Sequence, residues 1–401
     1  MPRRLLFLAH RIPYPPDKGE KIRAWHMLER LARRWTVELG CLVDDPRDLE
    51  HVPFLRGLCA HVEARPITAR WRAAARALVR ARPGTPLSLG WFRDAALESW
   101  VRGGLREGRW EAAFVYSSSM APYVMAPEAR LFRVLDMVDV DSAKWAAYAA
   151  GAKPPLRQVW AREARTLLAL ERHAAAVLER TLFVSEEEAN HFLALAPEAS
   201  GRVDWVENGV DLARFDPARP WPSPFPVGAV PLVFTGTMNY RPNVEAVSWF
   251  AETVLPALQP RFPGLGFWIV GANPAPAVQA LGRRPGVHVT GTVADVRPFL
   301  AHAAAAVAPL KIARGIQNKV LEAMAMARPV IASPQAFEGV RATPGRDLLV
   351  AGDAEATAAA VAAVLEGRHP GIGASGREAV RAGHDWSATL RRLDTLLPAE
   401  G

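Results

Sequence analysis

The sequence has very little cysteine: Cys41 and Cys59 are the only two in 401 residues. Two cysteines exclude a disulfide framework and a four-cysteine zinc site, and they fit a reducing cytoplasm. No apolar run is long enough for a transmembrane helix, so we expect none. The short apolar stretch near the start is followed by proline and charge, which argues against a signal peptide and favours a buried strand over residues 5–9.

Acidic residues are fewer than basic ones, 41 against 49, which gives a net charge of +8. This balance favours an anionic partner such as a phosphorylated substrate or an anionic membrane. The sequence lacks a zinc finger, an RNA-binding aromatic motif and a basic helical repeat, so we expect no nucleic-acid partner. Half of the residues are hydrophobic and 22% are charged, which is typical of a globular chain of two or three domains.

Short apolar runs alternate with helical patterns along the whole chain, and this alternation predicts parallel sheets covered by helices. In the first half we predict strands over residues 5–9, 37–43, 61–67, 112–116, 132–137 and 181–184. In the second half we predict strands over residues 232–235, 266–270, 287–290, 305–308, 330–332 and 348–351. A proline-dense stretch at 215–227 separates the halves and predicts a semi-rigid linker. The fold class is therefore α/β, with two open sheets whose ligands bind at the carboxyl ends of the strands.

The most informative motif runs from Pro309 to Ala332. Lys311, Arg314 and Lys319 surround a glycine-containing loop at a predicted helix start, and Glu322 lies one turn into that helix. Free N–H groups and cations at a helix start bind phosphates, and a carboxylate at this depth can accept hydrogen bonds from two ribose hydroxyls. The alternative is that Glu322 only pairs with Lys319 across one helical turn.

Glycines also follow three predicted strands on the same side of the second sheet, at Gly236, Gly271 and Gly291. Arg241, after the first of them, is placed to reach a phosphate. The GxGxxG spacing is missing, so a dinucleotide fingerprint is not supported. In the first half, Gly19 precedes a helix, and Lys18, Lys21 and Arg23 add positive charge to what is either an anion site or an ordinary solvated loop.

An acidic cluster, Asp136, Asp139 and Asp141, begins at the end of the fifth predicted strand and continues beyond it. It is a candidate for a divalent metal site or for a carboxylate that positions an acceptor hydroxyl, and we favour the second role. Ser185 and Glu188 predict a capping box at a helix start. Residues 68–82 form a basic amphipathic pattern that fits either an anionic membrane surface or a solvated helix face.

Taken together, these motifs resemble the family 4 retaining glycosyltransferases of GT-B fold. Within them, the closest resemblance is to the sugar transferases associated with PEP-CTERM/exosortase exopolysaccharide systems. The segments that carry the resemblance are the loop with Lys18 and Gly19, and residues 183–186, 206–211, 236–243, 269–271, 291–296 and 315–332. Two features depart from the family pattern: Arg314 stands at the position of the first of two family glutamates, and Asp139 and Asp141 stand where many relatives have a His-Asp pair. We hypothesise that Arg314 contacts a phosphate or a sugar carboxylate.

The resemblance implies an acceptor-binding Rossmann-like domain over residues 1–211, a linker over 212–230 and a nucleotide-sugar-binding Rossmann-like domain over 231–375. A C-terminal helical segment over 376–401 would cross back to the first domain. It implies catalytic roles for Asp139, Arg314 and Lys319. The implied donor-binding residues are Gly19, Gly236, Arg241, Gly291, Val293, Gly315, Gln317, Asn318 and Glu322. Neither a metal nor another cofactor is expected, because protein cations and helix ends would stabilise the departing diphosphate.

The sequence thus predicts a cytoplasmic glycosyltransferase that makes peripheral contact with an anionic membrane. It would move a sugar, with retention, from a nucleoside-diphosphate sugar to a lipid-linked or polysaccharide acceptor. Two alternatives remain open: a GT-B-fold sugar-nucleotide epimerase, and a non-catalytic sugar-nucleotide-binding partner of an export complex.

Overall fold

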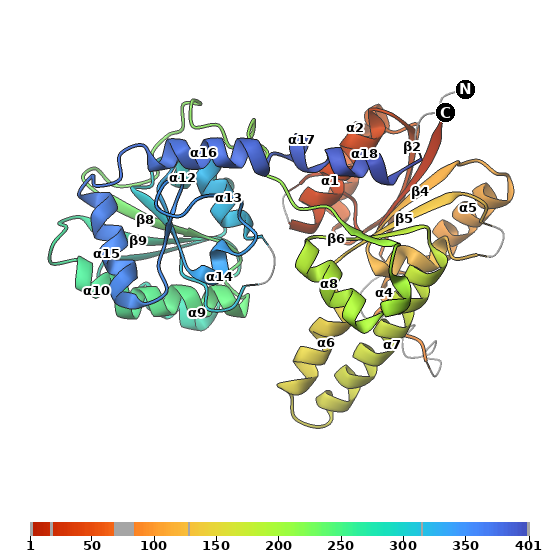
Figure 1. The fold of residues 1–401 in the computed structure, drawn as a ribbon, viewed down its shortest axis with the longest axis horizontal. Coiled ribbons are helices and arrows are strands. Elements are labelled where there is room, and N and C mark those ends of the chain that lie inside the picture. The colour runs from red at the N-terminus through yellow and green to blue at the C-terminus, as the bar shows by residue number, and fades with distance from the viewer. Residues whose placement is uncertain (1–2, 17–18, 68–83, 127–128, 314–315, 399–401) are drawn as a thin grey trace. The chain divides into compact units, whose positions relative to one another are not determined.

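The computed structural model describes residues 3–16, 19–67, 84–126, 129–313 and 316–398. The chain forms two compact units (Figure 1). Unit 1 comprises Met1–Val206 together with Leu390–Gly401, and unit 2 comprises Glu207–Thr389. The chain therefore passes between the units twice, after Val206 and after Thr389. Each unit is built on one parallel sheet, which confirms the predicted α/β fold class with two Rossmann-like domains.

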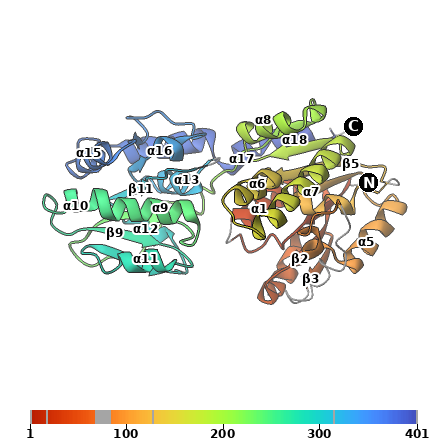
Figure 2. The same cartoon turned by 90° about the horizontal axis from the view of Figure 1, so that it is seen from below.

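Unit 1 contains a seven-stranded parallel sheet in the order β3-β2-β1-β4-β5-β6-β7. The strands are β1 (Arg4–Ala9), β2 (Thr36–Val43), β3 (His61–Pro66), β4 (Ala112–Tyr116), β5 (Phe132–Val138), β6 (Arg180–Phe183) and β7 (Val203–Trp205). The central strands are nearly continuous apolar runs, and all five residues of β4 are buried, because helices cover both faces of the sheet (Figure 2). The strand order reverses between β1 and β4, so loops from these strands diverge at the carboxyl edge and leave room for a ligand.

The helices of unit 1 vary widely in length, from four to 22 residues. They are α1 (Gly19–Ala32), α2 (Val52–Leu58), α4 (Leu89–Phe92), α5 (Ala95–Arg106), α6 (Asp141–Ala150), α7 (Leu156–Val177), α8 (Glu186–Leu195) and α18 (Arg391–Leu396). Three short 3₁₀ helices are η1 (Pro46–His51), η2 (Ser118–Tyr123) and η3 (Pro197–Ala199).

Helix α18 belongs to unit 1 although it comes from the other end of the chain. Its Leu393 is fully buried, and its Asp394 accepts a hydrogen bond from Nε of Arg30 on α1 at 3.1 Å. The guanidinium of Arg392 lies 3.6 Å from the ring centroid of Trp205 and pairs with Asp204 at 2.5 Å. Polar and apolar contacts together therefore attach the last helix to α1 and β7.

Unit 2 contains a six-stranded parallel sheet in the order β10-β9-β8-β11-β12-β13. The strands are β8 (Val230–Thr235), β9 (Leu265–Val270), β10 (Val287–Gly291), β11 (Ala305–Ala308), β12 (Val330–Ala332) and β13 (Leu349–Val350). The helices are α9 (Arg241–Trp249), the π-helix η4 (Phe250–Val254), α10 (Leu255–Leu258), α11 (Pro276–Leu281), α12 (Arg297–Ala301), α13 (Asn318–Ala325), α14 (Pro334–Phe337), α15 (Ala354–Leu365), α16 (Ile372–Gly383) and α17 (Trp386–Thr389). The order reverses between β8 and β11, which places the loops after these strands at the switch point of the sheet.

The proline-rich segment at 215–227 lies on unit 2 and contributes to its core. The ring of Phe225 is 4.9 Å from that of Trp268, and the indole N–H of Trp221 donates to the carbonyl of Asp216 at 2.9 Å. The guanidinium of Arg297 lies 4.8 Å from the ring of Trp221. The segment expected to be a linker is thus tied down along its length by aromatic contacts.

Every predicted strand coincides with an observed one, and the structure adds β7. The segment that joins unit 1 begins at Leu390, later than the sequence-based boundary at 376, because α16 and α17 are part of unit 2. Residues 68–82, the predicted basic helix, lie outside the described residues. Among the helices that are described, none has the length and apolar content needed to cross a membrane.

Candidate functional site

The carboxyl edge of the unit 2 sheet brings two glycine loops into direct backbone contact. Gly236 follows β8 with a φ of +157°, and Gly271 follows β9 with a φ of +151°. A Cβ on Gly271 would lie 1.7 Å from the carbonyl oxygen of Gly236, so only glycine fits there. The glycines therefore bring the backbone of two loops together at the switch point.

Lys319 lies over this glycine loop. Its Nζ donates a hydrogen bond to Oδ1 of Asn243 at 3.0 Å, and its Cε would lie 3.6 Å from a Cβ on Gly236. Asn243 is buried, and its Nδ2 donates to the carbonyl of Thr237 at 3.0 Å. The ammonium also lies 5.2 Å from the ring centroid of Phe234. The amide of Asn243 thus fixes the ammonium of Lys319 against the Gly236 loop.

Burial shapes the protonation of the two charged residues on α13. Burial lowers the pKa of Lys319 to about 8, against the opposing effect of Glu322. Burial also raises the pKa of Glu322 to about 7, against the effects of Lys319 and then Arg214. Burial therefore disfavours the charged form of both side chains. The hydrogen bond from Lys319 goes to Asn243. Pairing with Lys319 therefore does not by itself explain why a carboxylate, Glu322, stands at this position of α13.

The other donor-binding candidates of unit 2 are distributed around this centre. Gln317 is the N-cap residue of α13. Asn318, the first residue of that helix, has a buried Oδ1 with no hydrogen-bond partner among the described residues. Gly291 ends β10 with a φ of +67°, and Val293, in the next loop, packs against the core. Arg241 is exposed, and its Nε donates to Glu245 on the same helix at 2.7 Å. Arg314 and Gly315 lie outside the described residues.

Sequence reasoning missed Arg214, which precedes the proline-rich segment. Its positive charge acts on both Glu322 and Asp295, lowering the pKa of each carboxyl, although burial holds the pKa of Glu322 above its ordinary value. Its carbonyl accepts a hydrogen bond from Arg297 at 3.2 Å, and Arg297 in turn pairs with Asp295 at 2.6 Å. No sequence signal marks Arg214, because its position depends on how the following prolines lie on unit 2.

In unit 1, the end of β5 is strained and carries the acidic cluster. Val138 has a φ of +69°, a conformation that β-branched residues rarely adopt, and the β5–β6 register shifts between Asp136 and Val138. Such strain persists only where the surrounding structure imposes it, and it is most frequent at functional sites. The bend directs the chain so that Asp139 is exposed just beyond the strand.

Asp139 has an elevated pKa for a surface carboxylate. Desolvation at the strand end comes first among the causes, followed by repulsion from Glu188 and Asp141, and together they raise the pKa of Asp139 to about 6.

The predicted capping box is only half formed. Ser185 Oγ accepts from the Glu188 N–H at 3.2 Å, but the Glu188 carboxylate accepts from the Val140 N–H at 2.8 Å. Glu188 thus holds the loop that carries Asp139.

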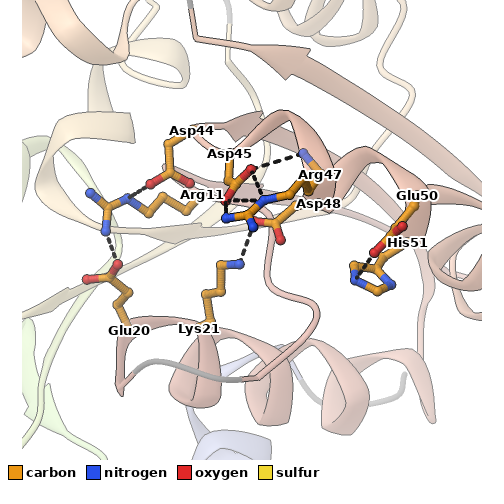
Figure 3. A network of polar contacts seen from close by, with 9 residues as sticks. All are labelled: Arg11, Glu20, Lys21, Asp44, Asp45, Arg47, Asp48, Glu50 and His51. Carbon is orange, nitrogen blue, oxygen red and sulfur yellow. Dashed lines mark hydrogen bonds and ion pairs between the residues drawn. The ribbon is translucent and has the colours of Figure 1, made fainter. Parts of the chain in front are cut away.

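Lys21 and Arg23 fit neither of the two alternatives left open for them, an anion site or an ordinary solvated loop. Lys21 is buried and donates to Asp48 at 2.6 Å, within the polar network of the β1–α1 and β2–η1 loops (Figure 3). Arg23 is buried and binds both oxygens of Asp136, at 2.8 and 3.1 Å, and the carbonyl of Val206 at 2.7 Å. Both cations neutralise buried carboxylates, so they hold unit 1 together instead of facing a ligand.

Two further predicted features of unit 1 can be located. Gly19 is the exposed first residue of α1, and a Cβ there would meet open space. Its neighbour Lys18 lies outside the described residues. Asp136 is committed to Arg23, and the part of the chain that the structure describes contains no group of three or more His, Cys, Asp or Glu residues arranged for a metal.

Residues 230–367 match the family model described as Glycosyl transferases group 1. The chain carries a glycosyltransferase domain. This domain contains Gly236, Asn243, Lys319 and Glu322, so the site described above lies within the matched region. No curated protein sequence matches the chain significantly.

Solved structures with the same fold extend over nearly the whole chain. Sucrose-phosphate synthase from Thermosynechococcus elongatus is 17% identical with a TM-score of 0.68, and the match covers 98% of each chain. WaaG, a glycosyltransferase involved in lipopolysaccharide biosynthesis, is 15% identical with a TM-score of 0.66, covering 98% of this chain and 100% of that one. Anabaena Alr3699/HepE, solved in complex with UDP-glucose, is 12% identical with a TM-score of 0.64, covering 97% of this chain and 98% of that one. These likenesses show the GT-B fold for both units.

Proposed function

We propose that the chain is a retaining glycosyltransferase that moves a sugar from a nucleoside-diphosphate sugar to a lipid-linked or polysaccharide acceptor. We place it in exopolysaccharide biosynthesis of the PEP-CTERM/exosortase type, at the cytoplasmic face of the plasma membrane. The sequence motifs of that family support this assignment, as does the glycosyltransferase domain over residues 230–367. The UDP-glucose complex of Anabaena HepE supports a nucleotide-sugar donor.

The observation that carries the proposal is the group formed by Gly236, Asn243, Lys319 and Glu322. The diphosphate of the donor would lie along the Gly236 loop and the start of α13, where Lys319 and the N–H groups of the first helical turn supply positive charge. Glu322, one turn further, would accept hydrogen bonds from the ribose hydroxyls. The base would lie near Gly291 and Val293, in the loops after the neighbouring strands.

In the reaction, the sugar–phosphate bond breaks and negative charge grows on the departing diphosphate. Lys319 stabilises that charge, and a fixed cation is effective there because it needs no reorganisation during the step. Arg314, four residues before α13 in the sequence, is assigned the same task. We assign no resident metal or other cofactor to this reaction. The acceptor hydroxyl forms the new bond to the anomeric carbon on the face that the diphosphate leaves, so the configuration is retained. Asp139, in the acceptor-binding unit, positions this hydroxyl and accepts its proton.

Calorimetric titration with a panel of nucleoside diphosphates and nucleotide sugars tests the proposal. We expect one nucleotide to bind, and Glu322→Ala to weaken it without changing the melting temperature of the free protein. The matched control is Glu355→Ala, which removes an exposed carboxylate from the first turn of α15. Equal affinity of the two variants would contradict the assignment of Glu322. A product whose anomeric configuration is inverted would contradict retention.

A further inference from the structure

A helical hairpin made of α6 and α7 projects from unit 1 (Figure 1). Its base is fixed by buried acids. The carboxylate of Glu171 accepts hydrogen bonds from the N–H and the hydroxyl of Ser142, at 3.1 and 2.5 Å. The carboxylate of Glu163 accepts from the N–H groups of Leu87 and Ser88, at 2.7 and 2.8 Å. These hydrogen bonds therefore fix the base of the hairpin to the rest of unit 1.

The tip of the hairpin, residues 144–160, exposes large apolar side chains. Tyr148 is 46% exposed, Leu156 53% and Val159 44%. The ring of Tyr148 lies 5.9 Å from that of Trp145 and 6.0 Å from that of Trp160, so the aromatic residues of both helices form one cluster. The exposed apolar side chains of the tip thus come from both helices. Exposed apolar clusters of this kind mark interaction surfaces.

The charge of the same segment has a single sign. Residues 142–162 contain no aspartate or glutamate, whereas Lys144, Lys153 and Arg157 are all exposed. Of the acids that border the segment, Asp141, the first residue of α6, is half-buried, and Glu163 is buried and accepts the hydrogen bonds from Leu87 and Ser88. The tip thus presents aromatic, aliphatic and basic side chains to solvent.

We propose that the tip of the α6–α7 hairpin docks on an anionic phospholipid membrane. Tryptophan and tyrosine favour the headgroup region, where their rings are apolar and their polar atoms reach water. Leu156 and Val159 enter the acyl boundary, and the three cations meet lipid phosphates. The charge complementarity favours a lipid surface over a second copy of this chain, since two such tips would repel each other. The inference adds a docking surface to the proposed function, which places the acceptor at a membrane.

Vesicle co-sedimentation of the full chain, without donor or acceptor, tests the surface. We expect binding to phosphatidylcholine vesicles that contain phosphatidylglycerol, much weaker binding to phosphatidylcholine alone, and loss of binding at high salt. Each cation near an anionic surface changes partitioning about five-fold, so K144Q/K153Q/R157Q is expected to weaken binding roughly 100-fold. L156S/V159S removes the apolar contribution, and F54S is the matched control because Phe54, on α2, is 52% exposed.

Several outcomes would overturn the docking surface. Binding that is equal for both lipids, or tip variants that bind like the wild type, would do so. Tip variants that abolish a dimer in sedimentation velocity without any vesicle binding would show instead that the tip joins two copies. Nucleotide binding is measured on the same variants, and we expect it to be unchanged. A chain that binds vesicles but no nucleotide would leave the docking surface intact and contradict the proposed function.

Discussion

The ammonium of Lys319 donates a hydrogen bond to the side-chain oxygen of Asn243 across 3.0 Å. This bond joins the start of α13 to the start of α9, and the amide nitrogen of Asn243 continues the connection to Thr237 in the loop after β8. The pair holds a cation against the Gly236 loop before any ligand arrives. A prepositioned cation loses little freedom when it binds a diphosphate.

The first prediction concerns this pair. Lys319→Met is expected to weaken nucleoside-diphosphate binding by about 10- to 100-fold, the range for loss of a hydrogen bond to a charged group. Asn243→Ala is expected to weaken it less, because the cation remains but is no longer fixed. The double variant should bind no worse than Lys319→Met. Calorimetry of all four proteins measures the coupling, and strictly additive losses would show that Asn243 does not act through Lys319.

The second prediction is a pH dependence of diphosphate affinity. Lys319, whose pKa is about 8, carries its charge below that pH and loses it above. Affinity for an anionic diphosphate should therefore fall as the pH rises through about 8. In Lys319→Met the affinity should be low at every pH and should not fall over this range. A pH of about 9 lies above the pKa of Lys319 in the free protein. A wild-type affinity that stays constant up to that pH would therefore exclude a contact between Lys319 and the diphosphate.

The third prediction concerns Asp139. Asp139→Asn is expected to lower the transfer rate by about 10²- to 10⁴-fold, as for loss of a general base, and to leave donor affinity unchanged. The pKa of Asp139 is about 6, so the wild-type rate should rise with pH through about 6 as the carboxylate ionises. The control is Glu187→Gln, which changes an exposed acid in the first turn of α8. A transfer rate that Asp139→Asn leaves intact would place the base elsewhere.

The fourth prediction concerns stability. Arg23→Met leaves the buried Asp136 carboxylate without its partner, and breaking a buried pair in this way costs about 3–5 kcal/mol. The double variant Arg23→Met/Asp136→Leu removes both charges and should regain part of that loss. Urea unfolding followed by circular dichroism compares the three proteins. A single variant as stable as the wild type would contradict the role assigned to the pair.

The sheets could be predicted because buried parallel strands are apolar runs that need no knowledge of their neighbours. The strand β7 escaped prediction because it has three partly exposed residues, one of them Asp204. The glycines at the sheet edge were found for the same local reason: a chain that turns sharply after a strand requires them.

Side-chain partners could not be predicted in this way. In the sequence, Lys21, Arg23 and Lys319 cannot be told apart, because each is a cation near a predicted helix start. Only the fold shows that Asp48 and Asp136 reach the first two from distant segments, whereas Lys319 meets a neutral amide. The charge of a residue is local information, but the identity of its partner depends on which strands become neighbours.

Because Leu390–Pro398 completes unit 1 from the far end of the chain, this unit cannot finish assembling on the ribosome until unit 2 has been synthesised. Until then, α1 and β7 lack the helix that covers them. An N-terminal fragment ending near Val206 would keep that apolar surface open to water. A circular permutant that begins at Leu390 would instead encode all of unit 1 as one continuous segment, which could fold before unit 2 is synthesised.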